Sequence, residues 1–166
     1  QNQALQDDIV TGRLLDADLG IGYRYATQYL TLGAFAAAHV RDRNLDNNDP
    51  SNDLSTGTRW GARFGLEASG NINGFVYSAI GQVSTVETAL WTRGRVGYNF
   101  GRVTVGPEFI YLNDAMFDER RFGGFVTVQI LNNLSITASG GSADFGSALG
   151  GKGNTPYGAL GFVVSF

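Results

Sequence analysis

Apolar and polar residues alternate with a period of two along most of this chain. The run 59–69 places Trp60 and Leu66 on one face and Arg63 and Glu67 on the other. Successive side chains of a strand point to opposite faces, so this pattern predicts strands with one apolar and one charged face. Apolar residues at helical spacing are hard to find along the chain.

Comparable alternating segments recur to the end of the chain. Counting back from Phe166 gives nine strands to about Leu14, and the polar stretch from Leu5 to Gly12 is a weaker tenth candidate. Single-chain bacterial barrels usually have an even number of strands. We therefore predict ten strands, with eight as the alternative if two segments merge or one stays outside the barrel.

The connections between these segments alternate between short turns and longer polar loops. The short turns lie near residues 27–28, 71–74, 101–102 and 132–133, and the longer loops cover 42–56, 114–120 and 146–156. One connection on the loop side, at 87–89, is short. Short turns at one rim and longer loops at the other are typical of outer-membrane barrels, in which the long loops face outside. The predicted fold is all-β, a small antiparallel transmembrane up-and-down β-barrel formed by one domain over residues 1–166.

The apolar rows also carry aromatic residues near the strand ends, as in the aromatic girdle at a membrane interface. A terminal phenylalanine on an alternating strand resembles the recognition signal of outer-membrane barrels. We therefore expect the bacterial outer membrane as the location. The expected partners are outer-membrane lipid and lipopolysaccharide, the barrel-assembly machinery through the C-terminal strand, and neighbouring membrane proteins. The interface aromatics are Tyr23, Tyr25, Tyr29, Tyr98, Phe100, Phe162 and Phe166.

The polar faces carry charges of both signs, which we interpret as a salt-bridged lumen rather than an open charged channel. Eight-stranded barrels have interiors just wide enough for side chains, and ten strands add little room. Arg63 with Glu67, and Glu108 with Arg93 or Arg121, are the expected pairs. The predicted lumen charge network is Arg59, Arg63, Glu67, Arg93, Arg95, Glu108 and Arg121.

Composition narrows the function further. Charged residues make up 16% of the chain, against roughly 25% in an ordinary soluble domain. The net charge of −3 does not indicate the excess of basic residues that nucleic-acid binding requires. The absence of cysteine excludes disulfides and thiolate metal sites. No run of 18 apolar residues predicts a transmembrane helix. The start of the chain has no signal-peptide pattern, so an exported protein would be present here as its mature chain.

No residue pattern points to catalysis, and we expect no enzyme activity, no cofactor, no metal and no catalytic residue. His39 is the only histidine in the chain. A Ser-His-Asp triad that does not include His39 is therefore impossible. The segment 146–153 matches a phosphate-binding loop only as far as Lys152 and has no following helix pattern. The acidic segment 42–53 lacks the glycine and final glutamate of a calcium loop. Both segments are interpreted as external loops.

Several segments resemble one known family. They include GTRWG at 57–61, WTRGRVGY at 91–98, GPE at 106–108 and RFGGFV at 121–126. The similarity covers about residues 20 to 166 and is to the cellulose biosynthesis protein S (BcsS) family of alphaproteobacterial outer-membrane proteins. The resemblance implies a role associated with cellulose production and carries over no catalytic residue. Glu108 and Arg121 match the family elements, and we interpret them as lumen partners.

Three functions remain open from the sequence. The first is a non-enzymatic outer-membrane barrel that is structural or associated with exopolysaccharide (cellulose) production. The second is a narrow porin for small solutes. The third is a soluble, lipocalin-like ligand-binding barrel, which requires the aromatic rows to face inward.

Overall fold

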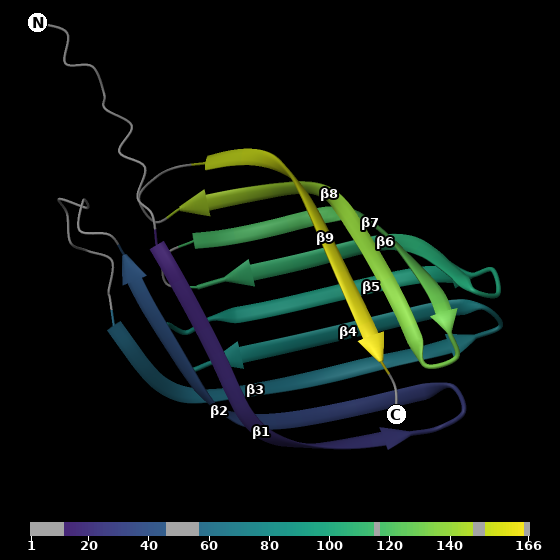
Figure 1. Cartoon of the computed structure of the whole chain (residues 1–166), viewed down its shortest axis with the longest axis horizontal. Helices are drawn as coiled ribbons and strands as arrows, with labels where there is room; N and C mark the ends of the chain where they lie inside the picture. The colour runs from purple at the N-terminus through teal and green to yellow at the C-terminus, as the bar shows by residue number, and fades with distance from the viewer. Residues whose placement is uncertain (1–11, 46–56, 115–116, 148–151, 165–166) are drawn as a thin grey trace, which may run out of the picture.

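The computed structural model describes residues 12–45, 57–114, 117–147 and 152–164, and they form one antiparallel sheet of nine strands (Figure 1). Within these ranges no helix is long and apolar enough to span a membrane. The strands are β1 (Gly12–Ala26), β2 (Leu30–Leu45), β3 (Gly57–Ile72), β4 (Phe75–Ser84), β5 (Leu90–Asn99), β6 (Val103–Asn113), β7 (Phe117–Leu131), β8 (Leu134–Ser147) and β9 (Lys152–Val164).

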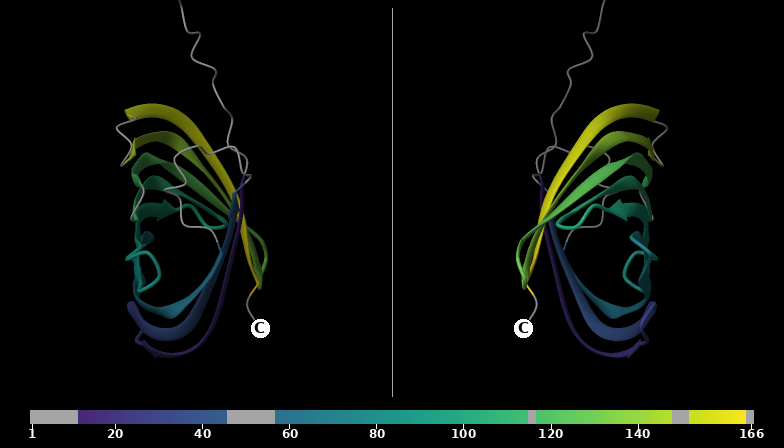
Figure 2. Two further views of the ribbon diagram at one scale, coloured as in Figure 1. Left: turned by 90° about the vertical axis from the view of Figure 1, so that its left-hand side faces the viewer. Right: turned by 90° about the vertical axis from the view of Figure 1, so that its right-hand side faces the viewer.

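The strands follow one another in chain order, and each pairs with the next in an antiparallel ladder. The sheet curls strongly, so that β1 and β9 both lie on the near side of the molecule in Figure 1 and run in the same direction, as the two side views also show (Figure 2). No pairing between β1 and β9 occurs among the described residues. The sheet is therefore open along these two edges.

The expected closed barrel of ten strands thus differs from the observed open sheet of nine. The segment from Leu5 to Gly12, proposed as a tenth strand, lies outside the described residues except for Gly12. That glycine begins β1, opposite Leu45 of β2. The fallback of eight strands is wrong, because every one of the nine segments forms its own strand and none merges with a neighbour.

The four short turns fall where the sequence places them. Asn73, Gly74 and Gly101 adopt positive φ angles of 51°, 87° and 90°, a conformation favoured in tight hairpin turns. The longer connections are shorter than expected, since β7 already begins at Phe117 and β9 at Lys152. Polar residues at those strand ends do not interrupt the ladder, because backbone pairing does not depend on the side chain.

The convex outer face of the sheet is apolar and the concave face is polar, as the alternation predicts. Leu19, Ile21 and Trp60 are 84%, 82% and 76% exposed on the outer face. His39 and Glu108, in the opposite phase of their strands, are buried on the concave face. A soluble ligand-binding barrel would require the reverse orientation, so this arrangement argues against that alternative.

Some aromatic residues lie on the concave face, out of phase with the outer apolar rows. Phe125 is buried there, and its ring lies 3.0 Å from the position that a Cβ would occupy on Gly97. The ring of Phe35 likewise fills the space in front of Gly65. Glycine on one strand therefore makes room for an aromatic ring on another, which fills the interior of the curl.

A substitution at Gly106 tests how closely β5 and β6 approach each other. A Cβ at Gly106 would overlap the carbonyl oxygen of Val96, whereas a Cβ at Gly94 would meet nothing within 4 Å. We expect Gly106→Ala to lower the free energy of unfolding by about 1–3 kcal/mol, because backbone has to move to accommodate the methyl group. Urea unfolding in detergent micelles measures this change.

Gly94→Ala is the matched control, since it adds the same methyl group to the neighbouring strand. We expect it to change the free energy of unfolding by less than about 0.5 kcal/mol. Equal stabilities of the two variants would contradict the observed packing of β5 against β6.

Candidate functional site

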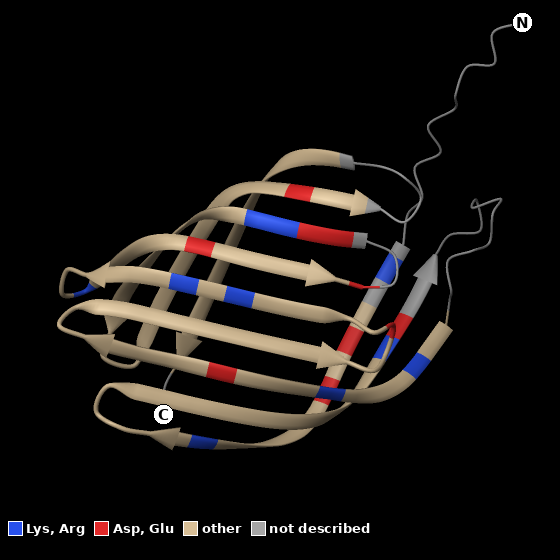
Figure 3. Ribbon diagram, turned by 180° about the vertical axis from the view of Figure 1, so that it is seen from behind, with Lys and Arg blue, Asp and Glu red and all other residues tan. Residues whose placement is uncertain are grey.

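Ion pairs on the concave face form two groups. Figure 3 marks the positions of the charged residues along the strands. The first group lies on β1, β2 and β3 and on the turn after β4. We name it the His39 cluster, which consists of Asp16, Asp18, His39, Arg41, Arg63 and Glu87. The second lies on β5, β6, β7 and β9. We name it the Glu108 cluster, which consists of Arg95, Glu108, Glu119, Arg121 and Tyr157.

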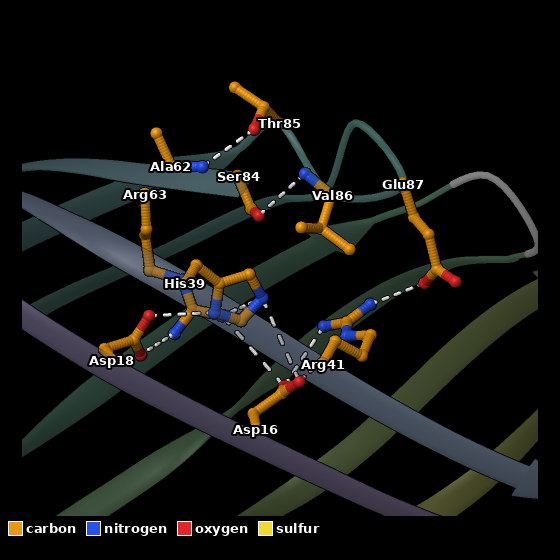
Figure 4. Close-up of polar contacts among 10 residues, drawn as sticks. All are labelled: Asp16, Asp18, His39, Arg41, Ala62, Arg63, Ser84, Thr85, Val86 and Glu87. Carbon is orange, nitrogen blue, oxygen red and sulfur yellow. Dashed lines mark hydrogen bonds and ion pairs between the residues drawn. The ribbon is translucent and has the colours of Figure 1, made fainter. Parts of the chain in front are cut away.

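His39 lies at the centre of its cluster and is completely buried. Its Nδ1 is 2.8 Å from Oδ1 of Asp18, and its Nε2 is 3.2 Å from Nη2 of Arg63 (Figure 4). A guanidinium only donates hydrogen bonds, so Nε2 has to be the acceptor in that contact. The Nδ1–H then donates to Asp18, and the geometry fits a neutral histidine. Arg63 also forms an ion pair with Asp18.

Arg41 joins strands that are not neighbours in the sheet. Its Nε and Nη2 donate to the two carboxylate oxygens of Asp16 on β1, at 2.9 and 3.1 Å. Its Nη1 donates to Oε2 of Glu87 at 2.7 Å (Figure 4). Glu87 belongs to the turn between β4 and β5, where Ser84 and Val86 are buried. This turn therefore folds toward the concave face and is held there by a buried ion pair.

Glu108 is the buried centre of the second cluster, with its side chain fully shielded from solvent. It forms an ion pair with Arg95, which stands directly opposite it on β5. The hydroxyl of Tyr157 donates to Oε1 of Glu108 at 3.4 Å, and the Arg95 guanidinium lies 4.9 Å from the centre of the Phe125 ring. Contacts thus run from β5 and β6 across to β9.

Arg121 completes the Glu108 cluster on β7. Its Nε and Nη2 donate to the carboxylate of Glu119 at 2.9 and 2.8 Å. Its guanidinium also lies 5.5 Å from the centre of the Tyr157 ring. Arginine suits this position because its planar fork pairs with a carboxylate and stacks on an aromatic ring at once.

The structure brings most of the predicted lumen residues into ion pairs, but with different partners. Arg63 pairs with Asp18, and Glu67 pairs with Arg24 at 2.8 Å, so the expected Arg63–Glu67 pair is wrong. Residues four apart on one strand are roughly 13 Å apart, at about 3.3 Å per residue, which is too far for a direct pair.

Glu108 also pairs with a residue other than those expected. Arg95 stands opposite it, whereas Arg93 stands opposite Ile110 and Arg121 pairs with Glu119. Arg59 and Arg93 make no ion pair with another described residue.

The predicted interface aromatics lie on the outer face, many of them near the turn rim of the sheet. Tyr23, Tyr25 and Tyr29 are exposed there. The ring of Tyr98 packs edge-on against Phe75 and Phe100, with centroid distances of 5.1 and 4.8 Å. Phe162 is exposed on the outer face of β9, and Phe166 lies outside the described residues.

Sequence reasoning missed several members of the clusters. Arg41, His39 and Glu87 are network residues that the sequence analysis does not identify. Tyr157 and Phe125 were not assigned to the interior at all. For Phe125 a signal existed, because it falls in the polar phase of the row from Phe122 to Ile130.

The arrangement offers charge neutralisation and no evident catalytic chemistry. Among the described ranges, no group of three or more histidine, aspartate or glutamate side chains is placed to hold a metal ion. The described ends of segment 146–153 continue β8 and β9 rather than a phosphate-binding loop. Most of the acidic segment 42–53 lies outside the described residues.

The fold and its charge clusters define a class of all-β protein, a single antiparallel meander with an apolar outer face and buried ion pairs on its concave face. Within that class, the chain belongs to the family described as "Cellulose biosynthesis protein BcsS", which matches residues 2–166. This match confirms the resemblance noted in the sequence. No curated protein and no solved structure matches the chain.

Glu108 provides a test of the buried network. We expect Glu108→Gln to lower the free energy of unfolding by about 3–5 kcal/mol, because it leaves the Arg95 charge buried without its partner. Glu67→Gln removes the carboxylate of the more exposed Arg24 pair, and should cost less than about 1 kcal/mol. Denaturant unfolding of both variants in the same detergent measures the difference. Similar losses in the two variants would show that Glu108 is not the centre of a buried network.

Proposed function

We propose that this protein is a non-enzymatic outer-membrane β-barrel with a salt-bridged interior, and that it supports cellulose production at the cell surface. The observation that carries the proposal is the polarity of the sheet. Large apolar side chains cover its outer face, while its charged side chains pair on the concave face.

The outer face supports a lipid environment. Soluble monomers rarely expose contiguous apolar patches of more than a few hundred Å². Here rows of exposed apolar side chains lie on the outer face of strands such as β1, β3 and β9. In a bilayer the same rows would contact acyl chains without penalty. Aromatic rings near the turn rim suit the interface, where an amphipathic ring is well placed. Lipid and lipopolysaccharide are accordingly the proposed surroundings, and β9 is the proposed strand for recognition by the assembly machinery.

The membrane also requires closure of the sheet. Lipid offers no hydrogen-bond partners, so unpaired backbone groups along β1 and β9 would cost several kcal/mol each. The curl of the sheet brings both edges to one side of the molecule (Figure 2). The proposal therefore requires that both edges be paired in the membrane.

The concave face supports a plugged interior more than an open pore. Arg41 is tied to both Asp16 and Glu87, and the turn that carries Glu87 folds inward. Glu108, Arg95 and Tyr157 form a second set of contacts across the curl. Most of the described interior charges are thus paired with one another, which favours the structural role over the narrow porin.

The two tryptophans allow a direct test of the membrane proposal, because Trp60 lies on the outer face and Trp91 lines the concave face. Trp91→Phe leaves Trp60 as the only tryptophan, and Trp60→Phe leaves Trp91. We expect lipids brominated on their acyl chains to quench Trp60 strongly and Trp91 weakly in reconstituted vesicles. The measurement is the ratio of emission in brominated and unbrominated vesicles. Equal quenching of both, or stronger quenching of Trp91, would contradict the proposed orientation.

The cellulose role is tested in the bacterium that encodes the protein. Deletion of the gene should lower surface cellulose, measured as glucose released by cellulase from washed cells, and expression of the wild-type chain should restore it. Because the proposed role is not enzymatic, cellulose synthase activity in isolated inner membranes should remain unchanged. A deletion strain with normal surface cellulose would overturn this role, although the membrane placement would still stand.

A further inference from the structure

A cavity of about 290 Å³ lies on the concave face between β5, β6, β8 and β9. Its polar lining includes Arg93, Arg95 and Glu108 on one side and Thr137 and Ser139 on the other. Residues 159–163 of β9 also line it. This volume is far larger than the roughly 10–15 Å³ needed to hold one water molecule. The cavity therefore has room for a small hydrated solute.

Arg93 is the one lining cation without a counter-charge among the described residues. Its guanidinium lies 5.5 Å from the centre of the Trp91 ring, and its Nε is buried without a hydrogen-bond partner. A donor that is shielded from solvent and lacks an acceptor is costly, whereas the Arg93 side chain as a whole is only half-buried. Arginine cannot escape this cost by losing its proton, because it stays charged in proteins. The cavity thus presents a positive charge that forms no ion pair with a described carboxylate.

The neighbouring carboxylates do not supply one. Glu108 is already engaged by Arg95 and by the Tyr157 hydroxyl, and Glu119 is engaged by Arg121. Around the cavity, three guanidiniums therefore face two carboxylates. The local excess is one positive charge, although the whole chain has a net charge of −3.

The lining also offers hydrogen bonds of the kind that an anion accepts. The side-chain hydroxyl of Ser139 can donate from the wall opposite Arg93, whereas the hydroxyl of Thr137 shares a 2.7 Å hydrogen bond with Thr127. Guanidinium groups bind oxyanions by paired, charge-assisted hydrogen bonds, which are shorter and stronger than neutral ones.

We propose that this cavity is a binding site for a small oxyanion, of the sulfate or phosphate class, held by Arg93 with Arg95 and Ser139 nearby. The site goes beyond the structural role proposed above, and all its lining residues lie on β5, β6, β8 and β9. It adds a ligand to an interior that is otherwise neutralised by its own ion pairs.

Trp91 reports on the site because the Arg93 guanidinium lies over its ring. The full chain with Trp60→Phe has Trp91 as its only tryptophan and is folded in detergent micelles. Sodium sulfate is titrated at constant ionic strength against sodium chloride, and Trp91 emission is recorded. We expect a saturable change in emission. A change that is absent or linear in sulfate would overturn the proposal.

Arg93→Gln in the same background is expected to raise the apparent dissociation constant for sulfate at least tenfold. Arg102→Gln is the matched control, since it removes an exposed arginine in the β5–β6 turn, and should leave the constant unchanged. Circular dichroism verifies the strand content of each variant. If Arg93→Gln does not fold, Arg93→Lys replaces it, and its loss of the forked geometry should weaken binding several-fold. A constant equal to that of the parent in the folded Arg93 variant would overturn the site, and the brominated-lipid result would be unaffected.

Discussion

The backbone ladder is the constraint on which the rest of this structure depends. Eight consecutive antiparallel pairings join nine strands in chain order, and each pairing fixes which face every side chain occupies. A shift of one residue in any ladder would move charged side chains to the outer face and apolar rows to the inside. The alternation of the sequence therefore has a single consistent solution. The charges converge on the concave face, where shielding from solvent makes pairing among them a requirement.

The two charge clusters meet this requirement in different regions of the curl. The His39 cluster ties β1, β2 and β3 to the inward turn that carries Glu87, and the Glu108 cluster ties β5 and β6 to β7 and β9. Buried ion pairs add little net stability compared with apolar packing, but breaking one is costly. Their main effect is therefore on specificity, since an alternative register would leave several charges unpaired. The proposed oxyanion site lies at Arg93, one of the places where this pairing is incomplete among the described residues.

The period-two pattern was enough to predict the strands, the four tight turns and the division of each strand into an apolar and a polar face. It did not predict the pairs, because pairing depends on register and curvature. The Arg95–Glu108 pair could have been predicted from the sequence. A turn at Gly101 and Arg102 places Phe100 opposite Val103. Counting five residues outward along each strand then places Arg95 opposite Glu108. The Arg41–Glu87 contact could not, because it joins β2 to a turn two strands away and arises only from the curl.

The odd number of described strands has a consequence for the sidedness of the chain. β1 begins beside Leu45 at the loop rim, whereas β9 ends beside Leu134 at the turn rim. The first and last described residues of the sheet, Gly12 and Val164, thus lie at opposite rims. Adding one strand at either edge would bring both ends of the sheet to the same rim. Under the proposed membrane placement, strand parity would therefore decide whether the two ends of the sheet face the same side of the membrane or opposite sides.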